Sequence, residues 1–162
     1  EISGSADVTL AGTVWVRGNV VIKNNAVVRV ASALSGKSVA VIANNPASQL
    51  SASTVKIDNN AAFIGAGAGS YVLVVSRNRS ASVGGGVRAI EIGNQADAGS
   101  VLLYSSAGEI LLQNNASLRE VTAYRIHIKN NAQVTYETGL AHTFFDSGPS
   151  GGYEILDWQE VE

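Results

Sequence analysis

The sequence predicts an all-β fold: a single-domain parallel β-helix (β-solenoid) of about seven coils, each of about 18 residues. A seven-residue phrase of alternating apolar residues, closed by a polar pair, recurs from VVIKNNA at 20–26 to IHIKNNA at 126–132. The polar pairs follow one another at intervals of 15 to 20 residues. Alternation with period two indicates strands, and self-similarity at a nearly fixed spacing indicates stacked repeats. Coils of irregular length with Asn corners favour a right-handed helix.

Aligning the copies places branched aliphatic residues in two columns, because successive side chains of a strand point to opposite faces. The first column is Val20, Ala40, Val55, Leu73, Ile90, Ile110 and Ile126. The second is Ile22, Ile42, Ile57, Val75, Ile92, Leu112 and Ile128. Both are expected to fill the bore. The intervening column is expected to face outward, and its apolar members form a candidate contact surface: Val21, Val41, Val74 and Leu111.

The polar pairs predict an asparagine ladder along one corner of the solenoid. Coils stack about 4.8 Å apart, so equivalent amides lie within hydrogen-bonding distance of the next coil. Asn also tolerates the left-handed backbone of a tight corner. A ligand site for sugar or calcium is the alternative, but binding does not require amides at every turn. The ladder residues are Asn24, Asn25, Asn44, Asn45, Asn59, Asn60, Asn94, Gln95, Asn114, Asn115, Asn130 and Asn131.

The repeat divides one domain into three parts. Residues 1–19 are expected to form a partial coil that caps the bore, with Trp15 contributing to the cap. Residues 20–140 form the repeat coils. Residues 141–162 carry aromatic residues around a Gly/Pro turn and are expected to form a C-terminal cap.

Composition restricts the partners. A net charge of −2 argues against nucleic acid, whose binding depends on concentrated Lys and Arg. The sequence has no cysteine for disulfides or thiolate metal sites, and no apolar stretch long enough to span or anchor in a bilayer. The chain begins at Glu1 without methionine, so we expect a processed chain or a fragment of an exported protein.

Two groups of charged residues are candidates for chemistry. The weakest copy of the phrase, LVVSRNR at 73–79, carries Arg77 and Arg79, which could form a small anion- or glycan-binding patch. The alternative is a corner where arginines only solvate the surface. Catalysis on a β-helix wall needs clustered carboxylates. Glu91 is the one acid in the outward column and Asp58 the one acid before a turn, so no enzyme activity, cofactor or metal site is predicted.

The closing stretch SGPSGGYEILDWQEVE, after Asn-rich coils, resembles the C-terminal region of pilus-associated, PilX-like bacterial surface proteins. That resemblance implies an exported surface module. The coil length is also similar to that of bactofilins, a resemblance that implies a cytoskeletal scaffold. The coils of bactofilins are punctuated by glycine, however, and the Asn-Asn turns of this chain do not match them.

The sequence therefore predicts a non-catalytic structural or adhesive module at the bacterial cell surface. Its expected partner is a protein or a surface glycan. A carbohydrate-binding or polysaccharide-degrading β-helix is the alternative, and a scaffold that self-associates end to end is a further one.

Overall fold

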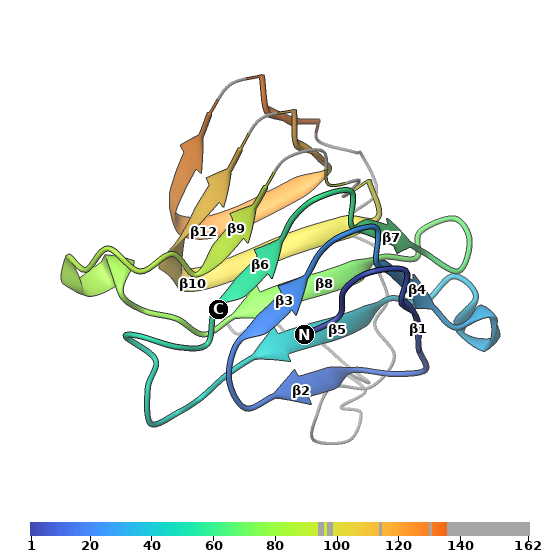
Figure 1. Ribbon diagram of the computed structural model, residues 1–162, viewed down its shortest axis with the longest axis horizontal. Helices are drawn as coiled ribbons and strands as arrows, with labels where there is room; N and C mark the ends of the chain where they lie inside the picture. The colour runs from blue at the N-terminus through green and yellow to red at the C-terminus, as the bar shows by residue number, and fades with distance from the viewer. Residues whose placement is uncertain (94–95, 97–98, 114, 130, 136–162) are drawn as a thin grey trace, which may run out of the picture.

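The computed structural model describes residues 1–93, 96, 99–113, 115–129 and 131–135. These residues form an all-β, solenoid-like arrangement in which the strands pair in parallel (Figure 1). Within them, the helical elements are two short 3-10 turns, η1 (Ser32–Leu34) and η2 (Ala81–Val83).

The first nine strands form three walls, which the chain visits in a fixed order. The first wall contains β1 (Asp7–Leu10), β4 (Val27–Val30) and β7 (Ala62–Ile64). The second wall contains β2 (Val14–Val16), β5 (Val39–Ala43) and β8 (Val72–Ser76). The third wall contains β3 (Val20–Ile22), β6 (Val55–Ile57) and β9 (Ile90–Ile92).

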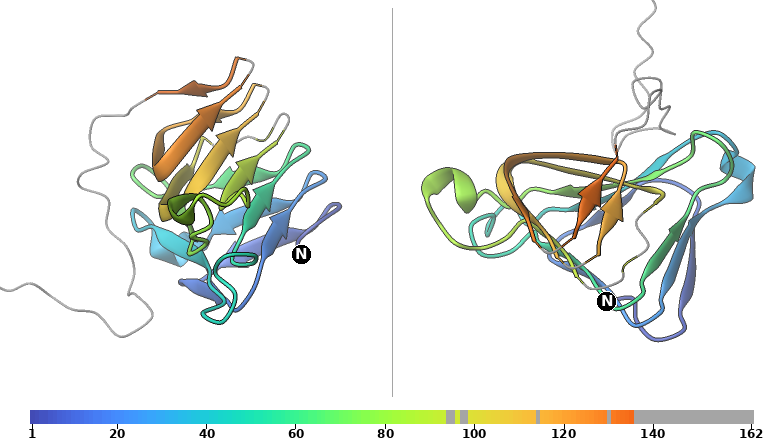
Figure 2. Two further views of the ribbon diagram at one scale, coloured as in Figure 1. Left: turned by 90° about the vertical axis from the view of Figure 1, so that its left-hand side faces the viewer. Right: turned by 90° about the horizontal axis from the view of Figure 1, so that it is seen from above.

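Beyond β9, two long strands join the second and third walls. The first part of β10 (Val101–Leu112) pairs with β8 and its last part pairs with β9. β12 (Glu120–Ile128) pairs along both parts of β10, with a register shift between Ser105 and Glu109. β11 (Ser117–Leu118) and β13 (Gln133–Val134) pair with each other. Figure 2 shows the strands stacked in rows around a common interior.

The coil length of about 18 residues expected from the repeat is wrong for the first part of the chain and fits only the last intervals. The third wall places Val20, Val55, Ile90, Ile110 and Ile126 in register, at intervals of 35, 35, 20 and 16 residues. The copies at 40–46 and 73–79 belong to the second wall instead, where β5 pairs with β8. The first passages are longer because loops and 3-10 turns separate their strands, whereas β10 and β12 run across two walls without interruption.

Moving two copies to another wall changes which of their residues face the interior. Val41 (6% exposed) and Val74 (fully buried) belong to the central apolar core, so the expectation that they face outward is wrong. Ile42 and Val75 are only partly buried and lie outside that core. On the third wall the expected column is confirmed for Ile22, Ile57, Ile92 and Leu112, which are fully buried. It is wrong on the last strand, β12, where Ile126 and Ile128 are 43% and 53% exposed.

The ends of the stack differ from its middle. Residues 1–19 supply β1 and β2, and Ile2 bridges Ile22 beside β3. An apolar hollow of about 210 Å³ opens at this end, lined by residues including Ile2, Leu10 and Val16. Trp15 is 49% exposed and does not line the hollow, so it does not cap the bore. The expected C-terminal cap at 141–162 lies outside the described residues.

Candidate functional site

The outer side of the second wall is apolar, as is its inner side, which packs in the core. One row joins Trp15, Ile42, Val75 and Tyr104 in register across β2, β5, β8 and β10. A neighbouring row joins Ala40, Leu73 and Leu102, and Tyr71 packs with the last two in a cluster separate from the core. We call these eight residues the outer face: Trp15, Ala40, Ile42, Tyr71, Leu73, Val75, Leu102 and Tyr104.

The sequence of the second wall explains why both of its sides are apolar. β5 reads VAVIA and β8 reads VLVVS, so inward and outward positions are both aliphatic. Parallel strands with such continuous apolar runs are typical of sheets covered on both faces. Trp15 and Tyr104 remain 49% and 39% exposed. The outer face is therefore a surface suited to contact with a partner.

The contact surface expected from the sequence is replaced by this outer face. Val21 and Leu111 do lie in one outward row of the third wall, together with Lys56, Glu91 and His127. Leu111, however, is only 1% exposed, and that row is largely charged. On the outer face, Trp15 and Tyr104 are exposed, and Ile42, Leu73 and Val75 are partly exposed, whereas Ala40, Tyr71 and Leu102 are buried.

Arginines flank the outer face at the carboxyl ends of its strands. Arg17 follows β2 and Arg77 follows β8, each one residue beyond a pair of register partners. Arg79 comes two residues after Arg77, and all three side chains are exposed. We call Arg17, Arg77 and Arg79 the arginine corner. The structure thus places the predicted Arg77 and Arg79 patch beside a third arginine that the repeat alignment did not single out.

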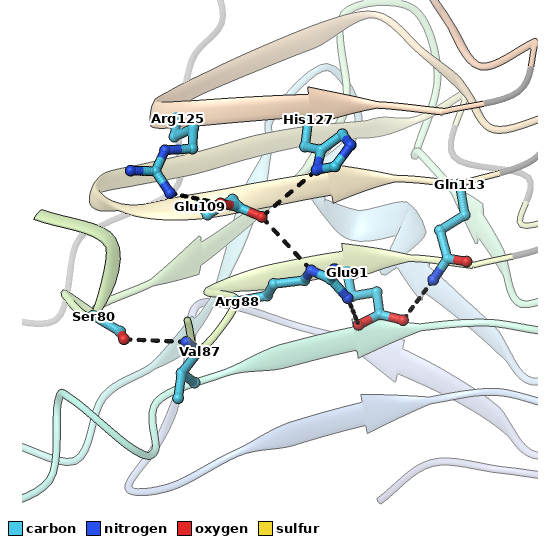
Figure 3. Close-up of polar contacts among 8 residues, drawn as sticks. All are labelled: Ser80, Val87, Arg88, Glu91, Glu109, Gln113, Arg125 and His127. Carbon is cyan, nitrogen blue, oxygen red and sulfur yellow. Dashed lines mark hydrogen bonds and ion pairs between the residues drawn. The ribbon is translucent and has the colours of Figure 1, made fainter. Parts of the chain in front are cut away.

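A separate charged cluster covers the third wall near the register shift of β10 (Figure 3). Glu109 is within 3.1 Å of Arg125 and 3.6 Å of Arg88, and His127 Nδ1 lies 3.9 Å from it. Arg88 also pairs with Glu91 at 3.6 Å, and Gln113 Nε2 donates to Glu91 at 2.6 Å.

The cluster adds Glu109 to Glu91, which the alignment gave as the one acid in the outward column. Glu109 escaped the alignment because it stands one residue before the phrase that starts at Ile110. Arg88 lies between Glu91 and Glu109 and contacts both, so the two carboxylates are linked through a shared cation. Both oxygens of Glu109 face cationic or ionisable groups. The arrangement is suited to holding adjacent strands together across the wall.

The asparagine corner is confirmed where the third wall turns into the first. Asn24, Asn25, Asn59 and Asn60 all have positive φ, between 49° and 63°. Asn59 Nδ2 donates to Asn24 Oδ1 at 3.1 Å, and Asn60 Nδ2 donates to Asn25 Oδ1 at 3.2 Å. These bonds form one step of the predicted ladder. Further along the chain, the backbone of Asn115 and Asn131 also has a φ of 60°.

Other predicted ladder residues have different roles or are not described. Asn44 is 8% exposed, and its Oδ1 accepts a hydrogen bond from Gln49 Nε2 at 3.0 Å. The Oδ1 of Asn45 accepts from the Ala47 amide at 3.3 Å, so this pair caps a loop rather than joining the ladder. The remaining ladder predictions, Asn94, Gln95, Asn114 and Asn130, lie outside the described residues.

No family model, curated protein or solved structure matches the chain. The resemblances to PilX-like proteins and to bactofilins therefore remain predictions. In the described part of the chain, no three His, Cys, Asp or Glu side chains are grouped so that they could hold a metal ion. None of the helical elements described here is long and apolar enough to cross a membrane.

Proposed function

We propose that the chain is a non-catalytic binding module of a cell-surface protein, built as a rigid β-helix that presents its second wall to a partner. The observation that carries this proposal is the outer face. It extends over four parallel strands, is apolar in both rows, and keeps Trp15 and Tyr104 half exposed.

Physical arguments support a binding role for this face. An exposed apolar surface is costly in water unless a partner covers it, and aromatic side chains contribute much of the energy at binding surfaces. Parallel strands held by backbone ladders provide a stiff platform, so little conformational freedom is lost on binding. Adhesion at a bacterial surface is the use that we propose for such a platform.

The experiment compares the intact chain with the double variant Trp15→Ala/Tyr104→Ala on a glycan array and on soluble polysaccharides, with product release measured in parallel. We expect saturable binding without product release, and a loss of at least about tenfold in affinity in the double variant. The matched control is Tyr124→Ala, which removes another exposed ring, 57% exposed, outside the outer face. Release of cleaved products would contradict the proposal, and so would equal binding by all three proteins.

A further inference from the structure

In the part of the chain that the structure describes, three arginines differ from the others in that their side chains have no partner. Arg29 pairs with Asp7, Arg88 with two glutamates, Arg125 with Glu109, and Arg119 Nε donates to the Gly99 carbonyl. Ser82 Oγ donates to the Arg79 backbone carbonyl, but within the described residues no ion pair or hydrogen bond engages the guanidinium groups of the arginine corner. Arg17, Arg77 and Arg79 are all exposed, so their guanidinium groups are free to bind an anion.

Backbone hydrogen bonds fix the corner in one row. The Asn44 amide donates to the Val16 carbonyl at 2.9 Å, and the Arg77 amide donates to the Ala43 carbonyl at 3.0 Å. Arg17, Asn44 and Arg77 therefore occupy equivalent positions on three adjacent strands. Two strand spacings, about 10 Å, separate the backbones of the two arginines.

The side-chain amides of Asn44 and Gln49 lie between Arg17 and Arg77. Gln49 Nε2 donates to Asn44 Oδ1 at 3.0 Å, and the Gln49 carbonyl accepts the amide hydrogen of Arg79 at 2.9 Å. The charge therefore alternates along the row. Arg17 and Arg77 are cationic, and the neutral amides of Asn44 and Gln49 lie between them. Arg79 adds a further positive charge beside Arg77.

The corner lies directly beyond the ends of the strands that carry the outer face. Arg17 stands two residues after Trp15, and Arg77 stands two residues after Val75, so each arginine shares a strand side with an apolar residue. A ligand that pairs with the guanidinium groups would also contact the indole ring and the aliphatic row.

The sequence surrounding the corner is depleted of acids. Residues 8–57 and 59–90 contain no Asp or Glu, and residues 1–90 hold eight Lys and Arg against three acids. The small net charge of −2 conceals this asymmetry, because the remaining residues hold ten acids against three bases. The potential around the corner favours an anionic partner.

We propose that the arginine corner and the outer face together bind an acidic polysaccharide, a chain in which uronic acids recur. This inference rests on the proposed function and names the ligand class of the same wall. Guanidinium groups bind carboxylates in a bidentate geometry, and aromatic rings pack against the apolar face of a sugar. A straight row of cation, amide and cation fits a linear polymer with regularly placed carboxylates better than an irregular protein surface.

The test measures binding of the intact chain to polygalacturonate and to its fully methyl-esterified form, which keeps the sugar backbone but loses the charge. We expect the esterified polymer to bind at least about tenfold more weakly, since charge-assisted hydrogen bonds to the corner are lost. The variant Arg17→Gln/Arg77→Gln/Arg79→Gln should lose about as much, and added salt should weaken binding by the wild-type chain. The matched control Lys23→Gln/Lys56→Gln/Lys129→Gln removes three charges elsewhere and should change affinity less than about twofold.

Several results would overturn the inference. An equal loss in the lysine variant would mean that only net charge matters, and absence of binding to polygalacturonate would refute the ligand class. Tighter binding of polyglutamate with the same arginine dependence would identify an acidic protein instead. Displacement of the polymer by a peptide of residues 136–162, which contains six acids and no Lys or Arg, would assign the corner to the chain's own end. Binding of neutral glycans that depends on Trp15 but not on the arginines would refute this inference and leave the proposed function standing.

Discussion

Replacing the paired asparagines at 59 and 60 tests how the corner is stabilised. Both residues adopt left-handed backbone, with φ of 49° and 60°, and both side chains donate to the previous corner. In Asn59→Ala/Asn60→Ala, two exposed hydrogen bonds are lost, at about 0.5 kcal/mol each for groups that water can replace. Holding two alanines in left-handed conformation adds about 1–2 kcal/mol per residue. We expect the free energy of unfolding to fall by about 3–5 kcal/mol.

The glycine variant Asn59→Gly/Asn60→Gly separates the two contributions. Glycine loses the same hydrogen bonds but tolerates positive φ, so we expect a loss of only about 1–2 kcal/mol. The matched control is Asn45→Ala, in a copy of the same phrase that has no positive φ in the structure. It should cost less than about 1 kcal/mol.

Guanidinium unfolding followed by far-UV circular dichroism measures these differences, with midpoints compared at constant slope. Equal losses in the alanine and glycine variants would show that the backbone conformation carries no cost. A loss at Asn45 as large as that at 59 and 60 would restore the uniform ladder and refute the division of the copies between two walls.

Three further changes test the core, the bulge of β10 and one ion pair. Ile57→Ala, at a fully buried position, should lower the free energy of unfolding by about 2–5 kcal/mol, whereas an unchanged denaturation midpoint would exclude Ile57 from the core. Gly108→Ala would place a methyl group against Ala89 Cβ, so we expect a loss of about 1–3 kcal/mol, and a stabilised variant would refute the close packing there. The hydrogen bond from Arg29 lowers the pKa of Asp7 below its ordinary value of 3.8. The stability contributed by this exposed pair should be present above pH 3.8 and be lost as pH falls through the lowered pKa, so the Tm difference between wild type and Asp7→Asn should vanish in acid, and a difference that persists there would contradict the assignment.

The sequence predicted the β class, the parallel stacking of the third wall and the left-handed asparagine corner. These three predictions depend on local sequence chemistry. Alternating apolar and polar residues favour strands, and Asn tolerates a backbone with positive φ. The division into two walls was missed because any strand that faces an apolar interior shows the same alternation. One signal was present, since Pro46 follows Asn45, and a residue before proline is disfavoured in helical conformations.

The candidate binding surface could be predicted only in part. The apolar runs of β5 and β8 predicted exposed aliphatic residues, but assigning them to the third wall selected Val41 and Val74 instead of Ile42 and Val75. Arg17 lies 60 residues before Arg77 in the chain. Their approach depends on the register of β2, β5 and β8, which no local pattern in the sequence specifies.

The most direct measurement of the central claim is an amide chemical-shift map of the isotope-labelled chain during titration with oligogalacturonate. We expect changes concentrated at Trp15, Ile42, Arg77 and Tyr104, including the indole N–H of Trp15. Changes concentrated instead around Glu109 on the third wall would place binding at the charged cluster. That result, or a spectrum that does not change, would contradict the claim that the second wall is the binding surface.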